Sequence, residues 1–217
     1  MIINYKKDYK KINQFVIFFC HKIKIFNVIY YIKQIKKRMV GMDMYDLEKF
    51  KEGSEQELKN IMDEYEKPLL RYCYSILFNF TDAEDVVQAV FVKAYFRRES
   101  IKSKETFQAF LYAIAYSESV DIIRKRKKNI FQKAEESIIN KNYMSEMVRN
   151  ALQTLSSEDR AIVYGRIVEE YSYAELAEIH NKKEATLRKR YERAKDKLAS
   201  ELEKCRSVQI KEKGELI

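Results

Sequence analysis

Glycine and proline are so scarce in this chain that they restrict the folds open to it. Its 217 residues include four Gly and one Pro, the residues that most tight turns and helix breaks require. Runs that alternate apolar and polar residues, as half-buried strands do, are absent from the sequence. We therefore predict an all-α protein, and the length suits one large or two small domains.

The net charge of +9 lies in the first 41 residues. That segment holds ten Lys or Arg and one acidic residue, Asp8. Because the whole chain has 42 Lys or Arg and 33 Asp or Glu, the remaining residues carry 32 of each. Overall basicity is thus no evidence for nucleic-acid binding, and only local clusters count. There are two, Arg124–Lys128, with five consecutive cations, and Lys183–Lys197, with seven cations and three acids.

The N-terminal extension, residues 1–41, leaves two interpretations open. Its apolar stretch, residues 15–31, is interrupted by polar residues, so it lacks the span of about 20 apolar residues that crosses a membrane. It also lacks the small-residue cleavage site of a signal peptide. The extension is either a basic segment lying on an anionic membrane or outside the working protein, with translation starting at Met39, Met42 or Met44. The composition change at Gly41 favours the second.

The sequence predicts no metal ion, cofactor or catalytic residue. Cys20, Cys73 and Cys205 are far apart and form no C-x-x-C pair, which indicates neither a zinc site nor a disulfide framework. Two His and no glycine-rich phosphate loop argue against an enzyme. We predict that Cys73 is a core residue and that the compartment is the reducing cytoplasm.

The segment 172–198 predicts a helix-turn-helix. Ser172 and Glu175 match the capping box, and Asn181 can take the left-handed conformation that a tight turn needs. The buried stripe of the second helix is Leu187, Tyr191, Ala194 and Leu198. The neighbouring stripe is Thr186, Lys189, Arg190, Arg193 and Lys197. Such a helix can enter the major groove; the alternative is an ordinary solvated basic face.

A second informative segment, residues 81–95, predicts a helix that docks on another protein. Thr81 and Glu84 repeat the capping pattern, so we expect the helix to begin here. Asp85, Gln88 and Val92 share one face, which suits contact with a partner's helix better than catalysis. Flanking helices are predicted over 69–77 and from Phe107 into the Arg124–Lys128 cluster, and three such helices can enclose one small core.

Four stretches in one order resemble the extracytoplasmic-function group of the sigma-70 family. They are D-A-E-D-V-V-Q-x-V-F-x-K-A-Y from Asp82, F-x-x-F-L-Y-x-I-A from Phe107, V-D-I-I-R-K-R-K-K from Val120, and S-Y-x-E-L-A-E-I followed by T-L-R-K-R-x-x-R-A-K-x-K-L from Ser172. The resemblance covers about 57–128 and 147–203. It implies a three-to-four-helix region 2-like domain (42–128), a polar linker (129–146), a region 4-like helix-turn-helix domain (147–203) and a tail (204–217).

The resemblance also implies roles for particular residues. Binding to core RNA polymerase falls to Asp82, Glu84, Asp85, Gln88 and Phe91. Recognition and melting of the minus-ten element fall to Tyr116, Ser117, Arg124, Lys125, Arg126 and Lys127. Recognition of the minus-thirty-five element falls to Lys183, Thr186, Arg188, Lys189, Arg190 and Arg193.

Departures from the family pattern predict an individual promoter preference. Tyr116 and Ser117 stand where the family commonly has Arg-Asn, and Gln88-Ala89 replaces Gln-Glu. Lys182 and Lys183 stand where an apolar residue and a Ser or Thr cap are usual, and they could hold phosphates instead.

The partners implied are core RNA polymerase, promoter DNA and an inhibitory anti-sigma factor, with the free chain a monomer. The alternative is a stand-alone helix-turn-helix regulator. Such a regulator needs a dimer interface, and no heptad seam is evident in the sequence.

Overall fold

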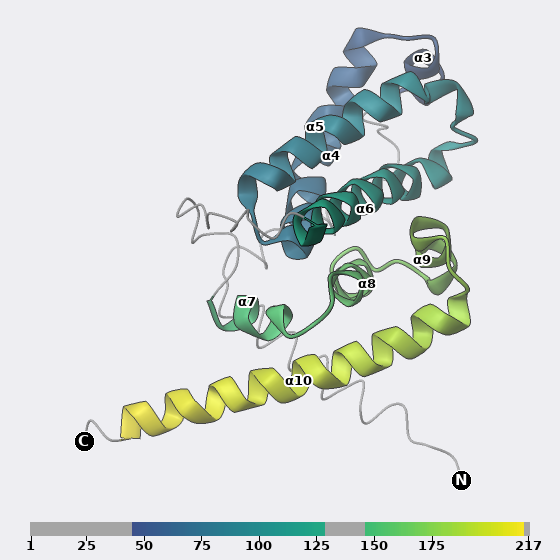
Figure 1. Cartoon of the computed structure of the whole chain (residues 1–217). Coiled ribbons are helices and arrows are strands. Elements are labelled where there is room, and N and C mark those ends of the chain that lie inside the picture. The colour runs from purple at the N-terminus through teal and green to yellow at the C-terminus, as the bar shows by residue number, and fades with distance from the viewer. Residues whose placement is uncertain (1–44, 129–145, 215–217) are drawn as a thin grey trace. The chain divides into compact units, whose positions relative to one another are not determined.

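The computed structural model describes residues 45–128 and 146–214, and within these ranges the regular structure is helical (Figure 1). The elements before residue 129 are α3 (Leu47–Lys51), α4 (Glu55–Leu77), α5 (Phe80–Phe96), the 3-10 helix η1 (Arg98–Ser100) and α6 (Lys104–Lys128). Those after residue 145 are α7 (Glu146–Gln153), α8 (Ser157–Ile167), α9 (Tyr173–His180) and α10 (Glu184–Gly214). The all-α prediction is confirmed. The expectations for the extension and for linker residues 129–145 lie outside the described residues.

None of the helices in the described ranges has a stretch long and apolar enough to cross a membrane.

Helix α4 begins well before the helix predicted over 69–77. Ser54 caps it, and it continues through Pro68. A proline inside a helix removes one backbone hydrogen bond and normally ends the helix. Here Ile61 and Tyr65 before the proline, and Leu69 and Tyr72 after it, are all buried in the core. Their burial favours helix on both sides of Pro68, which the local sequence alone does not indicate.

Helix α5 begins at Phe80, and its cap is Asn79 rather than the predicted Thr81. Phe78 takes the left-handed conformation at the end of α4, with φ 53°, and Asn79 is extended. The Asn79 side chain therefore accepts the Asp82 N–H at 3.0 Å, as an N-cap residue does. The Thr81 prediction is wrong because this residue already lies inside the first helical turn.

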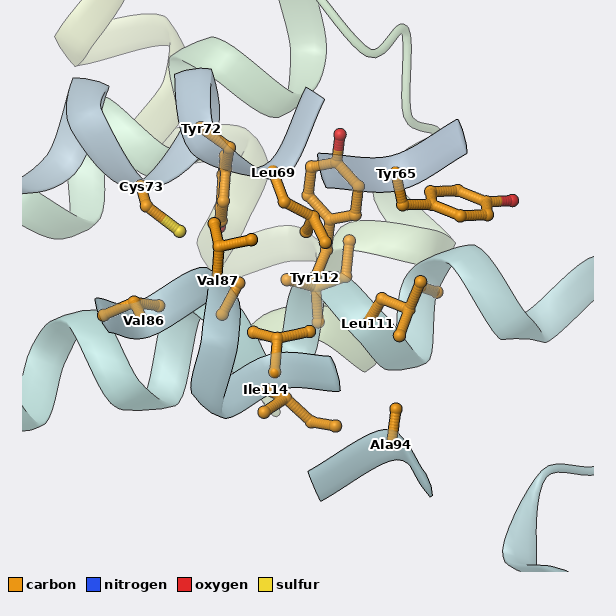
Figure 2. Close-up of a cluster of buried hydrophobic side chains, with 14 of the residues drawn as sticks. Tyr65, Leu69, Tyr72, Cys73, Val86, Val87, Ala94, Leu111, Tyr112 and Ile114 are labelled. Carbon is orange, nitrogen blue, oxygen red and sulfur yellow. The ribbon is translucent and has the colours of Figure 1, made fainter. Parts of the chain in front are cut away.

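A core of large apolar side chains lies between α4, α5 and α6 (Figure 2). The side chains labelled in Figure 2 are Tyr65, Leu69, Tyr72 and Cys73 from α4, Val86, Val87 and Ala94 from α5, and Leu111, Tyr112 and Ile114 from α6. Cys73 is fully buried, which confirms the prediction of a core residue. Burial raises the pKa of its thiol to about 12, so the reactive thiolate is scarce at neutral pH.

Helices α8 and α9 pack closely enough to need a glycine. A Cβ atom at Gly165 of α8 would lie 2.9 Å from Leu176 Cδ2 of α9 and 3.3 Å from Tyr171 Cδ2.

Helix α10 continues to Gly214, so the predicted boundary at residue 203 falls inside this helix.

The helices before residue 129 and those after residue 145 share one hydrophobic cluster. Helix α8 packs on α4, and α9 packs on α6. The Tyr72 and Tyr164 rings lie 5.6 Å apart, and the Tyr112 and Tyr171 rings 5.4 Å apart, both edge to face. Tyrosines distant in sequence, three from helices and Tyr171 from the connection between α8 and α9, thus close a common core in the described part of the chain.

Candidate nucleic-acid interface

Helices α9 and α10 form the predicted helix-turn-helix. The Ser172 hydroxyl accepts the Glu175 N–H at 3.2 Å, and the Glu175 carboxylate accepts the Ser172 N–H at 2.7 Å, which completes the capping box. Asn181 ends α9 in the left-handed conformation, with φ 49°. Leu187 and Ala194 of α10 are buried, so the neighbouring face of α10 is turned outward.

Most of the predicted DNA-contacting residues lie in the first three turns of α10, and Lys183 lies just before this helix. Those with exposed side chains are Lys183, Thr186, Arg188, Lys189 and Arg193. The Arg188 guanidinium lies 4.8 Å from the centre of the Tyr173 ring of α9, which restrains it without covering it. The Arg193 Nε donates to the Lys189 carbonyl at 3.3 Å. The result is an exposed cationic stripe on the second helix of the motif.

Arg190 differs from its neighbours because it is bound to α8. Its Nη2 lies 2.9 Å from Asp159 Oδ1 and 3.1 Å from Glu158 Oε2, and its Nε donates to Asp159 Oδ1 at 3.0 Å. Both carboxylates lie in the first turn of α8, which Ser156 caps. Arg190 therefore fastens the start of α10 to the start of α8.

The basic end of α6 carries a second group of predicted residues. Lys125 and Lys127 are exposed, whereas Arg126 forms an ion pair with Asp82 of α5. Arg124 is exposed and pairs with Asp121 of its own helix at 2.9 Å. The structure thus brings together two residues, Arg126 and Asp82, to which the sequence assigned different partners.

Tyr116 and Ser117 lie earlier on α6 in different environments. Ser117 is exposed. Tyr116 is half-buried, and its ring centre lies 4.2 Å from that of His180 at the end of α9. Burial is the main cause that raises the pKa of the Tyr116 hydroxyl to about 12, so this group stays protonated at neutral pH.

The outer face of α5 is polar at its start and apolar at its end. Glu84, Asp85 and Gln88 are exposed, while Phe91 is 5% exposed and packs in the core. The face continues to two apolar residues, Val92 (55% exposed) and Phe96 (79% exposed).

Phe96 is the residue on this face that the sequence interpretation missed. It lies eleven residues after Asp85, about three helical turns along the same face. That spacing could have found it.

In the described ranges, no group of three or more His, Cys, Asp or Glu is placed to hold a metal ion.

Two segments of the chain match known families. Residues 61–129 match sigma-70 region 2, and residues 145–198 match sigma-70 region 4. The first segment contains α5 and α6, and the second contains the helix-turn-helix.

Three characterised proteins show the same likeness. The ECF RNA polymerase sigma factor SigW of Bacillus subtilis (strain 168) is 25% identical over 72% of this chain and 94% of its own length. The RNA polymerase sigma factor SigV of the same organism is 26% identical over 67% of this chain and 91% of its own length. The sigma factor RpoE of Bartonella quintana, solved with the anti-sigma factor NepR, has a TM-score of 0.56 at 25% identity, over 67% of this chain and 98% of that chain.

A fourth likeness concerns the fold alone. CnrH, solved with the cytosolic domain of CnrY, has a TM-score of 0.56 at 18% identity, over 72% of this chain and 94% of that chain. Since both sigma regions follow one another in the chain with their helices in place, it belongs to the extracytoplasmic-function group of the sigma-70 family and is an RNA polymerase sigma factor.

Proposed function

We propose that three surfaces of this chain divide promoter recognition among them. The outer face of α5 binds core polymerase, the end of α6 captures and melts the minus-ten element, and α10 reads the minus-thirty-five element. The exposed cationic stripe on the second helix of a helix-turn-helix is the observation that carries this assignment.

On α10, the proposed contacts are of two kinds. Lys183 and Lys189 are point charges that can fix the helix on phosphates, whereas Arg188 and Arg193 can also pair with guanine edges. Thr186 is short and exposed, and it can contact either a base or a phosphate. Arg190 acts through its neighbours, because its bonds to Glu158 and Asp159 set the angle of α10 against α8.

On α6, the proposed contacts follow a melted strand. Melting requires a place for an unstacked base and cations beside the single strand. Ser117 and Tyr116 supply the first, and Arg124, Lys125 and Lys127 the second. Arg126 of α6 forms an ion pair with Asp82 of α5. Both residues therefore fix the position of the minus-ten surface on α6 relative to the polymerase surface on α5.

On α5, the proposed polymerase contact combines charge with apolar area. Glu84, Asp85 and Gln88 suit cations and amides of a partner helix, and Val92 and Phe96 add apolar area at the far end. Phe91 supports the helix from the core.

We also propose the conditions under which the chain works. It acts as a monomer in the cytoplasm, where polymerase and DNA are found, and an anti-sigma factor restrains it. RpoE of Bartonella quintana, which this chain resembles in fold and at 25% identity, was solved with such a factor.

Run-off transcription with core polymerase, on the DNA upstream of the chain's own gene, tests the proposal. Lys189→Ala and Asp85→Ala are expected to reduce the transcript, through lost DNA contact and lost polymerase binding respectively. Lys195→Ala is the matched control, because Lys195 lies further along the same helix and its charge is already paired with Glu192. A chain that shifts duplex DNA unaided, and that gives no transcript, would favour the stand-alone regulator.

The Phe96→Ser variant tests whether the end of α5 binds polymerase, separately from any effect on folding. Because Phe96 is 79% exposed, the change is expected to weaken binding to core polymerase while the melting temperature stays constant. Met62→Ser is the control, since Met62 is also exposed, at 40%, but lies on α4. Equal polymerase affinity in both variants would contradict a role for the end of α5.

A further inference from the structure

Glu158 of α8 binds two cations that belong to the helix-turn-helix. Its Oε1 accepts from the Nζ of Lys182 at 2.5 Å, and its Oε2 lies 3.1 Å from Nη2 of Arg190. Lys182 lies in the turn between α9 and α10, whereas Arg190 lies in the second turn of α10. The Glu158 side chain is 18% exposed, so the solvent screens these two ion pairs only in part.

Arg190 does not need Glu158 for its bracing role. Its Nε and Nη2 both contact Asp159 Oδ1, at 3.0 Å and 2.9 Å. The start of α8 is also capped without Glu158, because the Ser156 hydroxyl accepts the Asp159 N–H at 3.1 Å. What Glu158 adds to these contacts is therefore the ion pair with Lys182.

Lys182 lies where a helix-turn-helix meets the DNA backbone. It precedes Lys183 and the first turn of α10, and the N-terminal residues of the second helix of such a motif contact base edges in the major groove. A lysine beside that end of the helix can neutralise one phosphate. Here the charge of Lys182 is already neutralised by Glu158, so a phosphate can bind this lysine only when the ion pair breaks.

We propose that Glu158 is an internal counterion that limits how tightly the helix-turn-helix binds duplex DNA of any sequence. The proposal rests on the proposed role of α10 in reading DNA. Binding that is independent of sequence depends on the number of phosphates that a protein neutralises. Withdrawing Lys182 from that number weakens binding to the many non-specific sites of a genome, which compete for the chain. Base contacts by the exposed residues of α10 are left unchanged.

Neutralising Glu158 tests the proposal without polymerase. Glu158→Gln keeps the size of the side chain and frees Lys182. The probes are two labelled duplexes, one from upstream of the chain's own gene and one of unrelated sequence, and the readout is fluorescence anisotropy over a series of salt concentrations. The variant is expected to bind both duplexes about fivefold more tightly at about 0.1 M salt, with a salt dependence steeper by about one counterion. Equal affinity and equal salt dependence in variant and wild type would overturn the proposal.

Two further variants assign the gain to Lys182. Adding Lys182→Gln to Glu158→Gln is expected to abolish the gain, because no cation is then freed. Glu178→Gln is the matched control, since Glu178 is exposed on α9 and forms no ion pair with another residue of the described ranges. A gain from Glu178→Gln as large as that from Glu158→Gln would overturn the proposal, because it would then come from net charge alone.

A second substitution covers the case in which Glu158→Gln disturbs the fold, which the melting temperature of the variant reports. Glu158→Asp keeps the charge in the first turn of α8 but shortens the side chain by one methylene, which draws the carboxylate away from Lys182. It is also expected to tighten duplex binding, though less than Glu158→Gln. Where Glu158→Gln is unfolded, the absence of any gain from Glu158→Asp would overturn the proposal.

Lys189→Ala separates this proposal from the proposed function. In both the wild-type and the Glu158→Gln chain it is expected to weaken duplex binding, since Lys189 is exposed on α10. Equal affinity of these two chains, with weaker binding whenever Lys189 is replaced, would overturn the role of Glu158 and leave DNA reading by α10 intact. Lys189→Ala without effect in either chain would contradict the proposed function, and the role of Glu158 with it.

Discussion

At the residue scale, neighbouring cations on α10 lie in different environments, because successive residues of a helix are rotated by about 100°. Lys189 is exposed, whereas the Arg190 side chain is 25% exposed and lies between Glu158 and Asp159. The sequence placed both in one cationic stripe. Which of the two residues forms an ion pair with a carboxylate depends on the position of α8, about thirty residues earlier in the chain. The local sequence around Lys189 and Arg190 does not predict that position.

Substitution of the two residues is expected to separate DNA binding from stability. Lys189→Ala should leave the free energy of unfolding unchanged, weaken binding to a promoter duplex and reduce the salt dependence of binding by about one counterion. Arg190→Ala should lower the free energy of unfolding by about 1 to 2 kcal/mol, since two partly buried carboxylates lose their partner in a site that solvent partly screens. Chemical denaturation and salt titrations of binding measure both. Equal stability of the two variants would contradict the bracing role of Arg190.

His180 is expected to make the fold sensitive to mild acid. Burial, the largest cause, together with Lys182 and Arg190, lowers its pKa to about 4, while Glu158 acts in the opposite direction. An unfolded chain protonates this residue near pH 6.5, so the stability that depends on neutral His180 is complete above pH 6.5 and is lost as the pH falls toward 4. The loss is on the order of 3 kcal/mol in the free energy of unfolding.

His180→Gln is the variant that checks this dependence. It removes the titrating group, so the slope of stability against pH between 4 and 6.5 should flatten in denaturation series. Tyr116, Glu158, Lys182 and Arg190 face the ring and remain in the variant. An unchanged slope would mean that another group causes the acid sensitivity.

At the element scale, the predicted start of a helix was correct where its N-cap residue could be recognised from the local sequence. The capping box of Ser172 and Glu175 was found because both partners lie within four residues. The same pattern at Thr81 and Glu84 was misleading, since Ser or Thr followed three residues later by Glu also occurs inside helices. The left-handed Phe78 places the extended cap residue of α5 at Asn79, and a non-glycine residue with positive φ leaves little signal in sequence.

Alanine substitution distinguishes the two candidate caps of α5. Asn79→Ala should lower the free energy of unfolding by about 1 kcal/mol, because the Asp82 N–H loses its acceptor. Thr81→Ala should be neutral or slightly stabilising, since Ala is the better helix former at a position inside the first turn. Urea denaturation measures both, and a larger loss for Thr81→Ala would restore the original prediction.

At the scale of the whole molecule, the shared core predicts cooperative unfolding. Because Tyr72 packs on Tyr164 and Tyr112 on Tyr171, the helices on both sides of residues 129–145 are expected to unfold in one calorimetric transition. Arg160→Ala, which removes the hydrogen bond from α8 to the Ile76 carbonyl of α4, should broaden or split it. Two well-separated transitions in the wild-type chain would show that the two groups of helices are energetically independent.

The sequence by itself determined the helical class, the helix-turn-helix and the positions of the cationic clusters. These features are local, because apolar periodicity, caps and charge runs are encoded within a few turns. Only the tertiary structure decided that Asp82 meets Arg126, that Phe91 is buried and that the His180 ring packs against the Tyr116 ring. Each of these depends on which distant helices come together, and packing between helices is set by the whole chain rather than by any one segment.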